Sequence, residues 1–133
     1  MLDKQELILV VDDMRMMRNV VKKILGQLGY ENIVEAENGK EAWTKYNELK
    51  DDDKTIGAIF MDIVMPMMNG KEVLMEIRKV DAKTPVVMLS SVADNKMIED
   101  CKRMGITDYI LKPINTDTGP KIIGDILAKV EPA

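Results

Sequence analysis

The sequence predicts an α/β fold in which a five-stranded parallel sheet is covered by helices on both faces. Short, continuously apolar runs alternate with longer segments whose apolar residues recur at helical spacing. Five such pairs fit into 133 residues, without an internal repeat or a low-complexity segment. Strands that alternate with helices in this way require parallel pairing and right-handed crossovers.

The five expected strands are short apolar runs that end at polar residues or proline. The run from Leu7 to Val11 is rich in branched residues and is followed by two aspartates, which is typical of a strand buried on both faces. The other expected strands are Ile33 to Ala36, Ile56 to Met61, Val86 to Leu89 and Tyr109 to Leu111.

Each of the five expected helices carries one apolar stripe. The first stripe is closed by Gly29, and Asn69 and Asp94 are placed to cap the third and fourth helices. We therefore expect one domain over residues 1–133, with no effector domain. The stripes consist of Met17, Val20, Val21, Ile24, Leu25 and Leu28; Ala42, Trp43, Tyr46 and Leu49; Val73, Leu74 and Ile77; Met97, Ile98, Cys101 and Met104; and Ile122, Ile123, Ile126, Leu127 and Val130.

Composition excludes several classes of function. A net charge of −4 argues against binding to nucleic acid, which requires a basic surface. Without histidine the chain has no Ser–His triad and no phosphohistidine, and its single cysteine forms no internal disulfide. The apolar run near the start is too short for a signal peptide or a membrane span. We expect a cytoplasmic protein that contacts no membrane.

Polar side chains follow four of the expected strands, at the point where each strand ends. Asp12 and Asp13 follow the first strand, Asp62 the third, Ser90 the fourth and Lys112 the fifth. The carboxyl ends of parallel strands meet at one edge of a sheet, where ligands bind. Three carboxylates brought together there repel one another unless a cation joins them, and an all-oxygen cluster suits Mg²⁺.

The same edge has the groups needed for phosphoryl transfer. Lys112 supplies a positive charge and Ser90 a hydroxyl for the oxygens of a transferring phosphoryl group. Asp62 is the candidate nucleophile, because a carboxylate can form an acyl phosphate. Taken singly, each of these residues is more simply explained as a helix cap or a turn. Their joint placement after successive strands favours a site.

These residues lie in four motifs, LILVVDD, IFMDIVMPMMNG, PVVMLSS and DYILKPI, and through them the chain resembles a response-regulator receiver domain of two-component signalling. The resemblance runs nearly end to end and is to the stand-alone receivers of chemotaxis. It implies a flavodoxin-like three-layer fold with strand order 2-1-3-4-5 and a cis peptide between Lys112 and Pro113.

The resemblance also implies roles for individual residues. Asp62 would be the phosphoacceptor, and Mg²⁺ would bind to Asp12, Asp13, Asp62 and the backbone carbonyl of Val64. Ser90 and Tyr109 would form the switch that senses the phosphoryl group, and Lys112 would pair with that group. Val64 and Val92 are apolar where many members of the family carry polar residues.

The implied function is that of a signalling switch whose only catalysis is its own phosphorylation and dephosphorylation. A histidine kinase, necessarily another protein, would phosphorylate Asp62. The surface around the fourth helix, fifth strand and fifth helix would then bind a downstream protein, such as a flagellar-motor switch component. A phosphatase is a further expected partner.

Three alternatives stay open at this stage. The protein could pass its phosphoryl group from Asp62 to a histidine-phosphotransfer protein as a phosphorelay intermediate. A flavin carrier of the same fold would need a hydroxyl- and glycine-rich loop where the chain has Asp12 and Asp13. A haloacid-dehalogenase-like phosphatase would need a second aspartate at the position of Val64.

Overall fold

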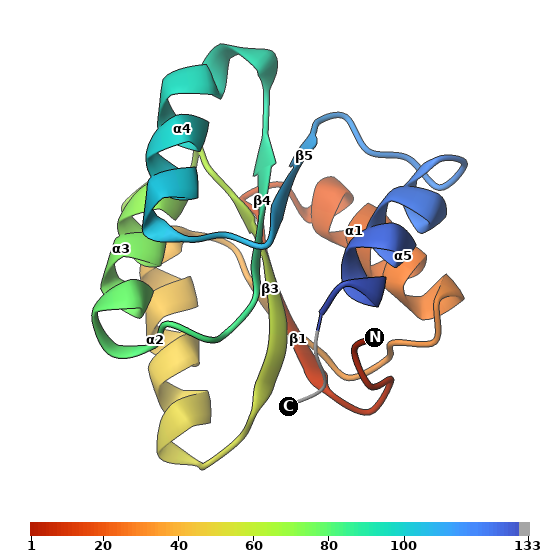
Figure 1. Ribbon diagram of the computed structural model, residues 1–133, viewed down its shortest axis with the longest axis horizontal. Helices are drawn as coiled ribbons and strands as arrows, with labels where there is room; N and C mark the ends of the chain where they lie inside the picture. Colours follow the sequence, from red (N-terminus) through yellow and green to blue (C-terminus); the bar gives the residue numbers. More distant parts are fainter. Residues whose placement is uncertain (131–133) are drawn as a thin grey trace.

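The five strands form one parallel sheet of order β2-β1-β3-β4-β5, as predicted. The computed structural model describes residues 1–130. Helices α1 and α5 cover one face of the sheet and helices α2, α3 and α4 cover the other, which gives three layers (Figure 1). The elements are β1 (Leu7–Val11), α1 (Arg15–Gln27), β2 (Ile33–Ala36), α2 (Gly39–Asp51), β3 (Ile56–Asp62), α3 (Gly70–Val80), β4 (Val86–Ser90), α4 (Asn95–Met104), β5 (Asp108–Leu111) and α5 (Gly119–Ala128).

The core consists of two apolar clusters, one on each face of the sheet. Strand residues alternate between them, so that Leu9 joins the cluster under α2, α3 and α4, whereas Val10 joins the cluster under α1 and α5. All residues of β1, β3 and β4 are buried. This burial on both faces explains why these strands read as continuous apolar runs. Within residues 1–130, no helix is long and apolar enough to cross a membrane.

The strand register aligns the polar residues that end the strands. Val11 pairs with Met61, and Asp62 with Leu89 on the neighbouring strand. Ser90 in turn pairs with Leu111. Parallel pairing in this register places Asp12, Asp62, Ser90 and Lys112 at one edge of the sheet, called here the carboxyl edge.

Asn69 caps helix α3, as predicted, and does so within a capping box. The Asn69 side chain accepts a hydrogen bond from the Glu72 N–H at 2.9 Å, and the Glu72 carboxylate accepts one from the Asn69 N–H at 3.1 Å. Asp94 occupies the N-cap position of α4, as predicted, but its side chain makes no capping hydrogen bond to that helix. Its carboxylate instead accepts hydrogen bonds from the N–H and hydroxyl of Ser91, across a 3₁₀ turn at Val92–Asp94 that precedes α4. Because the chain enters α4 from this turn, Ser91 is the residue with the extended backbone that a cap requires.

Asp81 organises the opposite edge of the sheet, in the connection from α3 to β4. Its carboxylate accepts hydrogen bonds from the Tyr46 hydroxyl at 2.7 Å, the Lys83 N–H at 2.9 Å, the Thr84 N–H at 3.0 Å and the Thr84 hydroxyl. Burial alone would raise the pKa of Asp81, but the hydrogen bonds from Thr84 and Tyr46 and those from the backbone outweigh it and hold the pKa well below its usual range. The Asp81 carboxylate therefore ties α2 to this connection.

Candidate functional site

Three carboxylates meet at the carboxyl edge of the sheet. Asp12 and Asp13 directly follow β1, and Asp62 is the last residue of β3. One carboxylate oxygen of each residue lies within 4.8 Å of the other two. Asp12 is fully buried and Asp62 is 5% exposed, whereas Asp13 is exposed. The cluster thus opens to solvent on the side of Asp13, where an ion or a substrate can enter.

Lys112 bridges the two buried carboxylates. Its Nζ lies 3.0 Å from Asp12 Oδ2 and 3.1 Å from Asp62 Oδ2. Burial alone would lower the pKa of Lys112, but the two carboxylates outweigh it and raise the pKa. Lys112 is therefore an ammonium at neutral pH. One ammonium among three carboxylates leaves the cluster with an excess of acidic groups.

The surroundings of Asp62 oppose its ionisation. Burial and the charge of Asp12 raise the pKa of Asp62 to about 6, against the lowering effect of Lys112. Its negative charge is thus poorly stabilised by the protein alone. A divalent cation near this carboxylate would favour its ionised form.

The carboxylate cluster fits a hard divalent cation. One oxygen of Asp12 accepts a hydrogen bond from the Met14 N–H at 2.9 Å, which fixes the rotation of the carboxylate. The other oxygen, Oδ2, is buried and faces the Lys112 ammonium at 3.0 Å, the only group that pairs with it among residues 1–130. A divalent cation could share this oxygen with Lys112, since a carboxylate oxygen has more than one lone pair. An all-oxygen donor set of carboxylates is the kind that Mg²⁺ prefers.

The loop after β3 is held close to Asp62 by tight backbone packing. The Gly70 N–H donates a hydrogen bond to the Ile63 carbonyl at 2.7 Å. A Cβ at Gly70 would collide with the backbone carbonyl oxygen of Asp62, so only glycine fits at the start of α3. Val64 lies in this loop and is exposed. Its role as a carbonyl ligand stays a prediction.

Ser90 carries a buried hydroxyl at the carboxyl edge of the sheet. It ends β4, the strand next to β3, and is 1% exposed. Its Oγ has no hydrogen-bond partner among the residues described. An unpaired buried hydroxyl costs free energy unless another group occupies the site, so Ser90 is available to an anion bound at the carboxyl edge.

Tyr109 lies away from the carboxylates. It is 38% exposed on β5, and the Lys102 ammonium sits 4.9 Å from the centre of its ring. Its role in a switch with Ser90 stays a prediction. The expected cis peptide between Lys112 and Pro113 is present.

Comparison with known proteins decides the family. The protein-family model for the response regulator receiver domain matches residues 8–123 of the chain. The chain belongs to the response-regulator receiver family. It is 40% identical over 110 residues to the chemotaxis protein CheY of Bacillus subtilis, covering 83% of this chain and 88% of that one. It is 38% identical to CheY of Thermotoga maritima, covering 92% and 95% of the two chains.

Solved structures of receivers share the fold. The response regulator domain of Thermotoga maritima CheB superposes with a TM-score of 0.77 at 33% identity, over 95% of this receiver and 96% of that chain. CheY in the CheX–CheY–BeF3–Mg complex of Borrelia burgdorferi superposes with a TM-score of 0.79 at 27% identity, over 92% and 87%. The flavodoxin-like three-layer fold is therefore confirmed by both topology and comparison.

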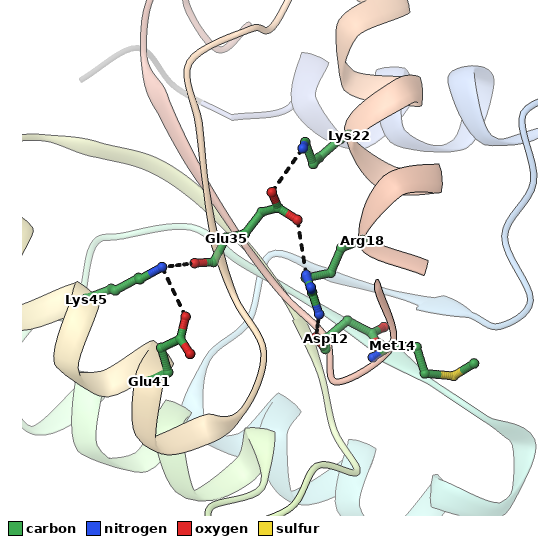
Figure 2. Close-up of polar contacts among 7 residues, drawn as sticks. All are labelled: Asp12, Met14, Arg18, Lys22, Glu35, Glu41 and Lys45. Carbon is green, nitrogen blue, oxygen red and sulfur yellow. Dashed lines mark hydrogen bonds and ion pairs between the residues drawn. The ribbon is translucent and has the colours of Figure 1, made fainter. Parts of the chain in front are cut away.

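A charged network next to the receiver's carboxylates was not predicted from the sequence. The Arg18 Nη1 donates to the backbone carbonyl of Asp12 at 2.8 Å, and its Nε donates to the Glu35 carboxylate at 3.1 Å (Figure 2). Glu35 also pairs with Lys22 at 2.9 Å, and the Lys45 ammonium donates to its backbone carbonyl. The Lys22 hydrogen bond is the main cause that lowers the pKa of Glu35.

The sequence holds a signal for this network. Arg18 lies three residues before Val21 and seven before Leu25, so it falls on the buried stripe of α1 among apolar residues. A cation on such a stripe requires a buried partner. The partner, Glu35, is an acidic residue within a strand. Its pairing with Arg18 cannot be predicted until the positions of that strand and of the helix that carries Arg18 are known in three dimensions.

Proposed function

We propose that this receiver is a phosphorylation-activated signalling switch in which Asp62 accepts a phosphoryl group from a histidine kinase. The observation that carries this proposal is the arrangement of Lys112, which bridges the buried carboxylates of Asp12 and Asp62 beside the exposed carboxylate of Asp13. A nucleophilic carboxylate, an acidic pair for a metal and a fixed cation are the parts that phosphoryl transfer to aspartate requires.

Transfer begins when the carboxylate oxygen of Asp62 attacks phosphorus as the bond from phosphorus to the donor's imidazole nitrogen breaks. The product is an acyl phosphate on Asp62 and a histidine side chain on the kinase. Asp12, Asp13, Asp62 and the carbonyl of Val64 would hold Mg²⁺, which neutralises charge on the phosphoryl oxygens when it is bound.

Two further residues stabilise the transferred group. The ammonium of Lys112 lies 3.1 Å from Asp62, close enough to pair with a phosphoryl oxygen attached there. The Ser90 hydroxyl, which lacks a partner, donates a hydrogen bond to another phosphoryl oxygen. Both groups are fixed at strand ends before the donor arrives, so little reorganisation is needed.

The added charge then changes the surface that binds a partner. Movement of Ser90 toward the phosphoryl group makes room for the ring of Tyr109, which is exposed on β5 in this structure. Leu111 and Ile122 expose apolar side chains on β5 and α5. Phosphorylation thereby shifts the surface formed by α4, β5 and α5 from one side-chain packing to another. The downstream protein binds to only one of these two packings.

The chemotaxis relatives support a partner class. CheY proteins of Bacillus subtilis and Thermotoga maritima match most of the chain, which favours a chemotaxis receiver that acts on a flagellar-motor switch component. The complex of CheX with CheY, BeF3 and Mg from Borrelia burgdorferi supports binding of a second protein, and the expected phosphatase would be a partner of that kind.

Intact-protein mass spectrometry tests the proposed chemistry. Incubation with acetyl phosphate and Mg²⁺ is expected to add one phosphoryl group that hydroxylamine removes, because an acyl phosphate is labile to that nucleophile. Without Mg²⁺ the gain should be lost or greatly slowed, since the carboxylate cluster then lacks its cation. A stable phosphoryl group, or a gain that is equal without Mg²⁺, would contradict the proposal.

A further inference from the structure

We propose that Arg18 is a positioning residue for the metal-binding aspartates, an inference that rests on the metal site of the proposed function. Arg18 is 8% exposed and comes from the first turns of α1. It donates one hydrogen bond from Nη1 to the backbone carbonyl of Asp12 and one from Nε to Glu35 (Figure 2). It contacts the backbone of a ligand and not the metal position itself.

The hydrogen bond to the Asp12 carbonyl controls two of the three carboxylates. That carbonyl belongs to the planar peptide that joins Asp12 to Asp13, so its direction fixes the chain at both residues. The Asp12 N–H donates to the Ala36 carbonyl at 3.2 Å, and one Asp12 carboxylate oxygen accepts from Met14. With Arg18 on the carbonyl, the backbone of Asp12 and one carboxylate oxygen are held by protein groups, so Oδ2, which faces only the Lys112 ammonium, is the atom of Asp12 that is directed toward a cation.

Glu35 fixes the direction of the guanidinium. Its carboxylate is shared between Arg18 at 3.1 Å and Lys22 at 2.9 Å, and its carbonyl accepts from Lys45 on α2. Glu35 lies on β2, which pairs with β1 through Val10. Only a planar guanidinium presents two donors in fixed directions to two separate acceptors, so lysine cannot replace Arg18 fully.

Whether replacement of Arg18 weakens or tightens the binding of a divalent cation distinguishes a positioning role from a purely electrostatic one. Arg18 carries a positive charge next to a proposed cation site, so removal of that charge alone would tighten binding of a divalent cation. If Arg18 acts by holding the Asp12 peptide, its removal weakens binding instead. Loss of a group that orients a metal ligand typically reduces metal affinity on the order of 10-fold to 100-fold.

Titration of the intact protein with Mn²⁺, followed by electron paramagnetic resonance without any phosphoryl donor, tests the proposal. Arg18→Met is expected to weaken Mn²⁺ binding by at least about 10-fold, and Arg18→Lys is expected to remain weaker than wild type. Lys22→Met is the matched control, because it removes a cation from the same Glu35 carboxylate without touching Asp12. Its affinity should equal or exceed that of wild type.

Thermal unfolding of the same variants separates positioning from a general loss of stability. Arg18→Met and Lys22→Met both lose a partner of Glu35, and only the first should lose metal affinity. If Arg18→Met does not fold, Arg18→Lys alone decides the matter. Unchanged or tighter Mn²⁺ binding by the folded Arg18 variants would overturn the positioning role. Absence of Mn²⁺ binding by wild type would instead overturn the proposed metal site.

Discussion

Lys112→Met is expected to slow phosphorylation of the protein by acetyl phosphate by about 100-fold or more, because it removes a fixed cation from the phosphoryl position. The ammonium lies 3.1 Å from Asp62 and 3.0 Å from Asp12, and no other cation pairs with these carboxylates in the described part of the chain. The measurement is the rate at which intact mass increases at a fixed concentration of Mg²⁺. A rate equal to that of wild type would contradict a role for Lys112 in transfer.

The same substitution is expected to destabilise the protein in the absence of metal. It leaves the buried carboxylates of Asp12 and Asp62 without their shared partner, and breaking a buried pair in this way costs about 3 kcal/mol. Part of that loss should be restored by Mg²⁺, because the ion relieves the repulsion that the lysine relieved before. Mg²⁺ should therefore raise the unfolding temperature of Lys112→Met more than that of wild type.

Lys121→Met is the control for the loss of an ion pair as such. Lys121 pairs with Asp125 at 3.3 Å on the exposed surface of α5, where both side chains are mostly solvent-accessible. Exposed pairs contribute little to stability. The control is expected to keep the phosphorylation rate and the unfolding temperature of wild type. A similar loss in both variants would show that the effect of Lys112 is not specific to the carboxylate cluster.

Asp81→Asn is expected to reduce the free energy of unfolding by about 3 kcal/mol at neutral pH. The carboxylate accepts hydrogen bonds from Tyr46, Lys83 and Thr84, and hydrogen bonds to a charged acceptor are among the stronger ones in proteins. Tyr46 is buried and would lose its charged acceptor. Urea unfolding of wild type and variant at the same pH measures the difference.

The effect of Asp81 depends on pH with a defined sign. Its pKa in the folded protein is lower than in the unfolded chain, where an aspartate has a pKa of about 3.9. The carboxylate therefore stabilises the fold fully above the pKa of the unfolded chain. This stabilisation is lost as the pH falls from the unfolded pKa toward the lower pKa of the folded protein. The difference between wild type and Asp81→Asn should be constant near neutral pH and shrink below about pH 4.

Asp125→Asn provides the matched control for Asp81. Asp125 is an exposed aspartate whose only partner within residues 1–130 is Lys121. Its replacement should change stability by less than about 0.5 kcal/mol at any pH. A difference for Asp81→Asn that stays constant down to pH 2 would contradict the assigned ionisation of Asp81.

The fold could be predicted almost completely from the sequence because its three central strands, β1, β3 and β4, are buried on both faces. Runs such as Leu7 to Val11 carry a strong signal. The structure lengthens β3 to Asp62, whereas α1 and α5 end just before Leu28 and Val130, the last residues of their predicted stripes. Asp94 is at the predicted N-cap position of α4, but its carboxylate makes no capping hydrogen bond there because a 3₁₀ turn before α4 directs it to Ser91. Such a turn has no periodic pattern from which it could be predicted.

The site was partly predictable for a related reason. Residues that end parallel strands must share one edge, so the grouping of Asp12, Asp13 and Asp62 follows from strand order alone. The contacts of Arg18 with Asp12 and Glu35 depend on how α1 lies against β2, which no local pattern contains. The same holds for Gly70, whose close approach to the Asp62 carbonyl appears only in three dimensions.

Chemical trapping of the phosphorylated residue tests the assignment of Asp62 most directly. Wild type and Asp62→Ala are treated with acetyl phosphate and Mg²⁺, reduced with borohydride, which converts an acyl phosphate to homoserine, and mapped by peptide mass spectrometry. We expect homoserine at position 62 of wild type and at no position of the variant. Homoserine at position 12 or 13, or phosphorylation that persists in Asp62→Ala, would contradict Asp62 as the phosphoacceptor.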